Sequence, residues 1–136
     1  MTAESEAVVE PWARVVDASA LAAVLFGEPE ADAVAHRLGR AALVTTALLR
    51  FEIANVCWKK LRRHPEERAA LIEAHRLLDQ MELYELEVRL PEVVLLAERE
   101  GLTAYDASYL WLAQELDVEL VTLDDALSRA AARARH

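Results

Sequence analysis

VVDASAL, at residues 15–21, joins a β-branched run to helix-forming residues through one carboxylate, Asp17. The stretch ELVTLDDAL, at residues 119–127, has the same build, with Asp124 and Asp125 between its apolar run and the residues that favour a helix. A strand that passes directly into a helix is typical of a βα unit in a parallel sheet. Ligands of such sheets bind beyond the carboxyl ends of the strands, so these acids predict a functional site at that edge.

The rest of the sequence continues this alternation of strands and helices. Short apolar runs predict the strands, which we place at residues 14–17, 42–46, 83–88 and 118–123. Apolar residues at helical spacing, with glycine and proline at several breaks, predict helices at residues 19–26, 30–38, 47–63, 66–81, 91–100, 104–116 and 124–135. This order predicts an α/β fold whose parallel sheet is covered by helices on both faces.

Length and composition indicate one globular domain. The chain has 136 residues, of which 54% are hydrophobic, and we place a single domain at residues 14–136 behind an acidic arm at residues 1–13. The single cysteine, Cys57, excludes an internal disulfide and is compatible with the cytosol. We find no signal peptide and no run long enough to span a bilayer. The sequence therefore predicts a cytoplasmic protein without a membrane partner.

The charge of the chain weakens a nucleic-acid interpretation without excluding it. A net charge of −9 opposes attraction to a phosphate backbone. Residues 59–64 and 129–136 are nevertheless basic. Cations bound by carboxylates would offset a further part of the acidic excess.

Several acidic residues also have a purely structural explanation. Asp17 fits a turn in which Ser19 caps the following helix, and either Asp124 or Asp125 fits the cap of the last helix. Asp106 ends a Thr-x-x-Asp sequence that is close to a capping box. Taken singly, none of these residues requires a chemical role.

Glu52 lies in the helix predicted at residues 47–63, whose apolar side chains cover most directions. The polar residues of this helix share one narrow stripe at 100° per residue: Glu52, Asn55, Lys59 and Arg62. The simplest interpretation of the stripe alone is the solvated edge of a nearly buried helix.

The acidic residues are harder to explain together. Strand ends and the adjacent helix starts meet at one edge of the sheet, where four or five carboxylates would repel one another unless cations lay between them. Carboxylate oxygens are the ligands that Mg²⁺ or Mn²⁺ prefers, whereas zinc favours His or Cys at a paired spacing that the four His do not show. Hydrolysis of a phosphodiester by a metal-activated water suits such a site.

Four motifs resemble those of one family, the PIN domain, and within it the VapC-type toxins of toxin–antitoxin pairs. They are VVDASAL, LLRFEIANVCWK, GLTAYDASYLWLA and LVTLDDAL, in the family's order and at its usual separations. They span residues 15–127, which is most of the chain. The resemblance implies a three-layer α/β/α sandwich around a central parallel sheet of four to five strands.

The same resemblance implies an endoribonuclease that depends on Mg²⁺ or Mn²⁺. The positions that match the family's metal-binding and water-activating acids are Asp17, Glu52, Asp106 and Asp124. From the resemblance we expect RNA cleavage that leaves 5′-phosphate and 3′-hydroxyl ends.

Other residues are assigned around these acids. The resemblance gives Ser19 and Thr122 the role of orienting the carboxylates, and Asn55, in the polar stripe of Glu52, is a further candidate for it. Asp125 occupies a position that varies in the family and is kept as an additional candidate ligand.

The resemblance also implies partners. These are an RNA substrate, a cognate antitoxin that inserts a segment into the acidic groove, and a second copy in a homodimer or a toxin–antitoxin hetero-oligomer. Residues 47–63 and 93–97 offer apolar side chains for protein contacts, although ordinary core packing explains them more simply. The candidate phosphate contacts, for which a solvated helix is the simpler explanation, are Lys59, Arg62, Arg63 and the arginines of the tail.

Two further functions stay open. One is a PIN-like binding module with little catalysis that acts through its antitoxin, and the other is a nuclease for single-stranded DNA. The sequence also departs from the family in two places, because about fourteen residues precede the first strand and the chain ends in a basic helix without an obvious fifth strand.

Overall fold

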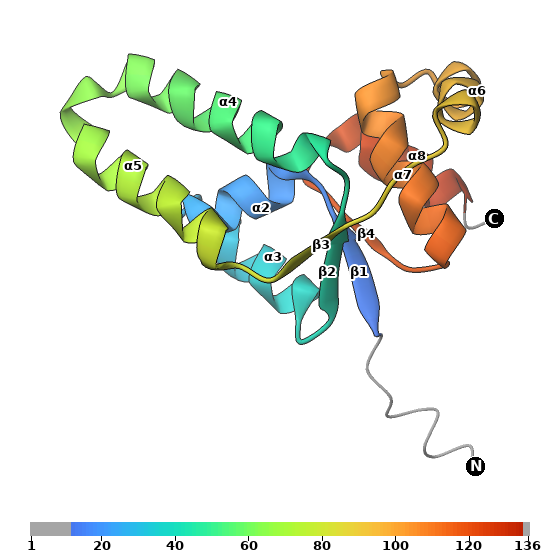
Figure 1. Ribbon diagram of the computed structural model, residues 1–136, viewed down its shortest axis with the longest axis horizontal. Helices are drawn as coiled ribbons and strands as arrows, with labels where there is room; N and C mark the ends of the chain where they lie inside the picture. Colours follow the sequence, from blue (N-terminus) through green and yellow to red (C-terminus); the bar gives the residue numbers. More distant parts are fainter. Residues whose placement is uncertain (1–11, 135–136) are drawn as a thin grey trace, which may run out of the picture.

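The computed structural model describes residues 12–134, which form four strands and a set of helices around them (Figure 1). The strands are β1 (Ala13–Val16), β2 (Ala42–Thr45), β3 (Leu83–Glu85) and β4 (Leu120–Val121). The α-helices are α2 (Ala18–Leu25), α3 (Ala31–Leu38), α4 (Leu48–Arg63), α5 (Arg68–Arg76), α6 (Leu90–Glu100), α7 (Ala104–Leu116) and α8 (Asp125–Ala134). Two 3₁₀ turns, η1 (Pro65–Glu67) and η2 (Leu77–Gln80), flank α5.

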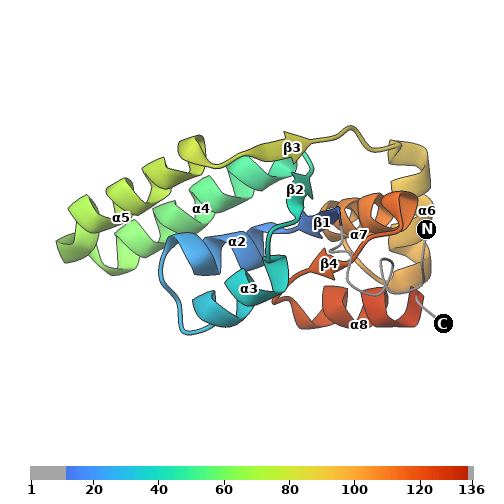
Figure 2. The same ribbon diagram turned by 90° about the horizontal axis from the view of Figure 1, so that it is seen from below.

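The strands form one parallel sheet in the order β3-β2-β1-β4. Helices α2 to α5 gather on one side of this sheet and α6 to α8 on the other (Figures 1 and 2). The fold is therefore the predicted three-layer α/β/α sandwich, with four strands in the described residues. Because all strands run the same way, their carboxyl ends share one edge of the sheet.

The central strands and α7 carry most of the core. Val15 and Val16 of β1 and Val121 of β4 are fully buried, as expected for a strand covered on both faces. Every residue of α7 from Ala107 to Ala113 is buried as well. The edge strand β3 is mostly exposed, so it closes the sheet without contributing equally to its interior.

Three predicted elements are shorter than their patterns suggested. The helix predicted at residues 66–81 is divided into η1, α5 and η2, and the tighter turn of η2 places Leu78 in the core. The strand predicted at 83–88 ends at Glu85, at the sheet edge. The strand predicted at 118–123 is reduced to β4, because the N–H groups of Leu123 and Asp124 bond to side-chain hydroxyls instead of a neighbouring strand.

Helix α4 is less buried than its apolar residues suggested. Leu49, Ile53 and Cys57 face the core, but the side chains of Phe51 and Trp58 are 78% and 56% exposed. Helices α4 and α5 form a hairpin that extends beyond the sheet, so one side of α4 has no layer to pack against (Figures 1 and 2). The apolar run at residues 93–97 also has a buried and an exposed side. Val93 and Leu96 are buried, whereas Val94 and Leu95 are exposed.

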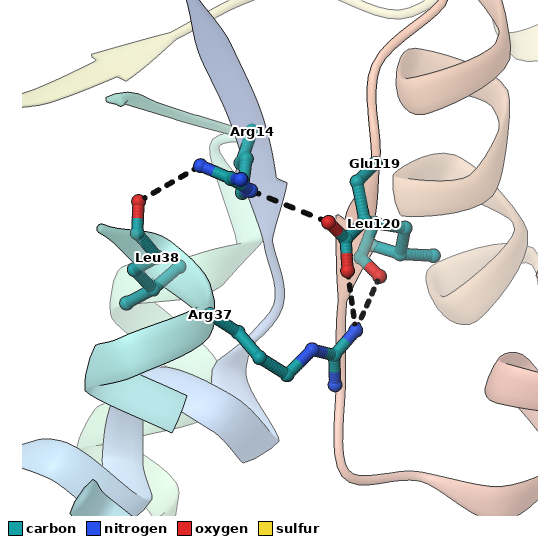
Figure 3. Close-up of polar contacts among 5 residues, drawn as sticks. All are labelled: Arg14, Arg37, Leu38, Glu119 and Leu120. Atoms are coloured by element: carbon teal, nitrogen blue, oxygen red, sulfur yellow. Dashed lines mark hydrogen bonds and ion pairs between the residues drawn. The ribbon is translucent and has the colours of Figure 1, made fainter. Parts of the chain in front are cut away.

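A charged network ties β1, α3 and the start of β4 together at the amino end of the strands (Figure 3). Arg37 Nη2 and Arg14 Nε donate to the Glu119 carboxylate at 2.8 and 3.3 Å. Arg14 also donates to the carbonyl oxygen of Leu38, at the end of α3, and Arg37 to that of Leu120. Burial raises the pKa of Glu119, but the hydrogen bonds from Arg37 and Arg14 outweigh it, so the pKa lies below its ordinary value.

Candidate active site

Asp17 is delivered to the carboxyl edge of the sheet by β1 and is 4% exposed. Its Oδ1 accepts hydrogen bonds from the Ala20 N–H at 3.0 Å and the Ser19 hydroxyl at 2.8 Å. Its Oδ2 accepts from the Thr122 hydroxyl at 2.5 Å. Asp17 is thus the N-cap of α2, and the alternative in which Ser19 caps that helix is wrong.

Two hydroxyls join the ends of β1 and β4. Thr122 Oγ1 donates to Asp17 and accepts from the Asp124 N–H at 3.0 Å. Ser19 Oγ accepts from the Leu123 N–H at 2.9 Å and lies 3.3 Å from Thr122 Oγ1. Both residues that the resemblance assigned to orientation therefore contact the Asp17 carboxylate directly.

Glu52 projects from α4, just after β2, toward α7. Its Oε1 accepts a hydrogen bond from the Tyr109 hydroxyl at 2.5 Å. Tyr109 is 1% exposed, and a buried tyrosine hydroxyl needs such a polar partner. The sequence analysis missed Tyr109 because its spacing in α7 reads as core, and its partner lies 57 residues away in the chain.

Asp106 and Asp124 stand at the first turns of α7 and α8. The Thr103 hydroxyl accepts from the Asp106 N–H at 3.1 Å, so Thr103 caps α7 and the Asp106 carboxylate is not needed as the cap. Asp124 Oδ2 accepts from the Leu127 N–H at 2.9 Å, so Asp124 caps α8. Asp125 is the exposed first residue of α8.

The four acids act on one another electrostatically. Burial, and then the negative charges of Asp106 and Asp17, raise the pKa of Glu52. The pKa of Asp106 is raised by burial and then by Asp124 and Asp17. Burial is the main cause that raises the pKa of Asp17, with Asp124 contributing. We define Asp17, Glu52, Asp106 and Asp124 as the acidic cluster, because each lies near enough to at least one other to influence its ionisation.

The donor set of the acidic cluster fits a hard divalent cation. All four groups offer carboxylate oxygens, which suit Mg²⁺ or Mn²⁺. Among residues 12–134, no arginine, lysine or histidine forms an ion pair with any of them, so no basic side chain compensates their mutual repulsion there. Within the same residues, no three carboxylates of the acidic cluster have oxygen atoms that all lie within 4.8 Å of one another. Such a close group of three potential metal ligands occurs instead at His64, Glu66 and Glu67. That exposed group lies at the far end of α4, about 18 Å along the helix from Glu52.

The remaining predicted residues lie along α4. Lys59 and Arg63 line a groove of about 370 Å³ between α2 and α4. Ser19 and Leu123 line the end of this groove that lies nearest the acidic cluster. Arg62 lies over the ring of Trp58 at 5.6 Å from its centroid. Asn55 is exposed and has no hydrogen bond to the acidic cluster within the described part of the chain. A larger cavity, of about 1130 Å³, lies beside Glu119 and Arg37 at the other end of β4, away from the acidic cluster.

Comparisons with known proteins agree with this fold. The family model of the PIN domain matches residues 14–133. Ribonuclease VapC3 from Pyrobaculum aerophilum is 33% identical over 119 residues, which cover 84% of this chain and 91% of that protein. The crystal structure of PAE2754 from Pyrobaculum aerophilum matches with a TM-score of 0.67 at 30% identity, covering 87% of this chain and 86% of that one. This protein therefore belongs to the PIN domain family, and a VapC-type ribonuclease is among its relatives.

Proposed function

We propose that this protein is a metal-dependent endoribonuclease toxin of the VapC type. The observation that carries the proposal is the convergence of Asp17, Glu52, Asp106 and Asp124, whose charges act on one another. The similarity to a protein named as a ribonuclease supports RNA as the substrate. The proposed reaction is hydrolysis of a phosphodiester that leaves a 5′-phosphate and a 3′-hydroxyl.

The acidic cluster would hold Mg²⁺ or Mn²⁺, with Asp125 as an additional candidate ligand. When bound, such an ion acidifies water and neutralises charge that develops on the phosphate. The protein's own contribution is orientation: Ser19 and Thr122 fix both oxygens of Asp17, and Tyr109 fixes one oxygen of Glu52. Repulsion within the cluster also disfavours a role as a mere binding module, which has no need to gather like charges.

The partners and location are also proposals. A cognate antitoxin that enters the acidic groove, and assembly into a homodimer or a toxin–antitoxin hetero-oligomer, follow from the VapC relationship. No helix in residues 12–134 has the length and apolar character needed to cross a membrane. We propose a cytoplasmic location, where an RNA substrate is available.

Cleavage of a total-RNA pool, with Mg²⁺, with Mn²⁺ and with EDTA, tests the proposed function. Discrete cuts that require metal and disappear in Asp106→Asn are expected, while Asp32→Asn, an exposed aspartate of α3, serves as the matched control. Asp17→Asn is the second test variant, and we prefer it to Asp17→Ala because asparagine can keep the cap of α2. Cleavage that persists in EDTA and in both the Asp17→Asn and the Asp106→Asn variants would refute the site. Cleavage of single-stranded DNA in place of RNA would reassign the substrate.

A further inference from the structure

The outward side of α4 carries two large aromatic side chains that the fold does not bury. Phe51 is 78% exposed and Trp58 is 56% exposed, although neither lies at a chain end or in a loop. Contiguous exposed apolar patches mark interaction surfaces, whereas single exposed apolar residues are normal, so the case for a partner depends on what surrounds the two rings. The question is which partner this surface fits.

The two rings share a stripe with polar and basic residues. At 100° per residue, the four exposed side chains fall within about 60° of one another: Phe51, Asn55, Trp58 and Arg62. The Arg62 guanidinium lies 5.6 Å from the Trp58 ring centroid, as in a cation–π contact. The stripe is therefore aromatic and positively charged at once.

Basic residues continue from this stripe to the groove between α2 and α4. Lys59 and Arg63 line the groove together with Glu28 and Glu30. Lys59, Arg62 and Arg63 form no ion pair in the described residues. Lys60 differs, because it pairs with Glu28. In a chain with a net charge of −9, the half of α4 from residue 55 to 63 has four basic residues and no acidic one.

The groove leads to the acidic cluster. Ser19, which donates to Asp17, lines it together with Leu123, the residue before Asp124. Trp58 lies six residues beyond Glu52, about 9 Å along the helix axis. That is the length of two to three nucleotides at a spacing of roughly 3.4 Å per nucleotide in a stacked strand.

We propose that α4 holds a single strand of RNA beside the acidic cluster, with bases stacked on Trp58 and Phe51 and phosphates held by Lys59, Arg62 and Arg63. The inference rests on the proposed function and names the form of its substrate. Aromatic faces combined with basic side chains are the usual means of binding unpaired nucleotides. A duplex hides its base faces, so it cannot use this surface.

Charge decides between RNA and a protein partner. The centres of protein–protein interfaces are depleted of lysine, whereas this surface has Lys59 at its edge, about 80° around the helix from Phe51 and about 100° from Trp58. A phosphate backbone would instead compensate the charges of Lys59, Arg62 and Arg63. Contact with a second copy of the chain is the alternative that the experiment must separate.

The test is binding of a short, unstructured, fluorescein-labelled RNA to the full chain in EDTA, measured by fluorescence anisotropy beside a duplex RNA of equal length. Trp58→Ala is expected to weaken single-strand binding by about tenfold, and Trp58→Phe to retain most of it, because phenylalanine keeps a stacking face. Lys59→Ala and Arg63→Ala are each expected to reduce the slope of log affinity against log salt by roughly 0.7. Trp12→Ala, at a 64% exposed tryptophan before β1, is the matched control and should leave binding unchanged.

Three results would overturn the inference. One is equal RNA affinity of the wild type and a folded Trp58→Ala variant, judged by circular dichroism. Another is tighter binding of the duplex than of the single strand. The third is a Trp58→Ala variant that loses self-association in sedimentation without losing RNA affinity, which would assign the surface to a second copy. Failure of the proposed function is distinguishable, because it would abolish metal-dependent cleavage while leaving the Trp58-dependent binding in EDTA intact.

Discussion

Asp17 is both the cap of a helix and one of the four acids of the cluster. The carboxylate caps α2 through the Ala20 N–H and also faces the other acids of the cluster. The hydroxyls of Ser19 and Thr122 hold it in place, and they come from opposite ends of the chain. The residue that caps α2 is therefore also a member of the acidic cluster.

Replacement of Thr122 by valine tests the orienting role at the residue scale. Valine keeps the shape but removes the hydroxyl that donates to Asp17, so metal affinity and cleavage rate are expected to fall by about 10- to 100-fold. Isothermal titration calorimetry with Mn²⁺ measures the affinity, and Thr122→Ser, which keeps the hydroxyl, is the control. Unchanged Mn²⁺ affinity in a folded Thr122→Val protein would contradict the role.

At the scale of elements, the turn between α6 and α7 aligns Asp106. Gly101 ends α6 with φ of 68°, a left-handed conformation that glycine adopts without steric cost, and Thr103 starts α7 two residues later. The Thr103 hydroxyl, and not the Asp106 carboxylate, satisfies the first turn. A contact between the Thr103 side chain and the Asp106 carboxylate also opposes the rise of the pKa of that acid.

Thr103→Ala is expected to lower the free energy of unfolding by about 1 kcal/mol, because the Asp106 N–H loses its acceptor. Urea denaturation followed by circular dichroism measures this change. Thr103→Ser retains the hydroxyl and should stay close to the wild type. A full-sized loss in Thr103→Ser would show that the methyl group, and not the cap, is responsible.

The network of Arg14, Glu119 and Arg37 predicts a pH-dependent contribution to stability. Since the folded pKa of Glu119 is lowered, its stabilisation is present above the unfolded pKa of about 4.3 and is lost as the pH falls through the folded pKa. Glu119→Gln should therefore cost about 1 to 2 kcal/mol at neutral pH and less in acid. Urea titrations at several pH values measure the difference, with the exposed Glu98→Gln as control. A difference that stays constant as the pH falls would exclude an ionic origin.

At the scale of the whole molecule, the acidic cluster opposes the stability of the metal-free fold. The folded pKa of Asp17 is raised, so its ionisation disfavours folding as the pH rises above about 3.9 and through the folded pKa. Asp17→Asn is expected to have a higher Tm than the wild type at neutral pH and to lose that advantage in acid. Differential scanning calorimetry measures both, and a lower Tm of Asp17→Asn at neutral pH would contradict the prediction.

A bound divalent metal ion should reverse the order of the two Tm values, so that the wild type becomes more stable than Asp17→Asn. A divalent ion at 100 times its Kd stabilises a folded protein by about 2.7 kcal/mol. Mn²⁺ is therefore expected to raise the Tm of the wild type and to have little effect on Asp17→Asn. Equal shifts in both proteins would show that the ion binds elsewhere, with His64, Glu66 and Glu67 as the alternative group.

Much of the fold was predictable because its signals are local. Alternation of apolar runs, the glycine after α6 and the threonine before α7 depend on residues within a few positions of one another. Asp17, Asp106 and Asp124 could be placed at element boundaries for the same reason. Glu52 had no such signal, and only the resemblance to the PIN domain separated it from an ordinary solvated stripe.

The sequence by itself determined the order of the elements, most of their caps and the acidic residues at their ends, since these follow from interactions along a few residues of chain. Only the tertiary structure decided which side chains meet. The order β3-β2-β1-β4 places β1 beside β4, so that Asp17 reaches a hydroxyl 105 residues away. The fold brings Glu52 of α4 within hydrogen-bond distance of Tyr109 in α7, and the hairpin of α4 and α5 left Phe51 and Trp58 exposed. Periodicity cannot reveal such facts, because burial depends on whether another layer happens to cover a given side of a helix.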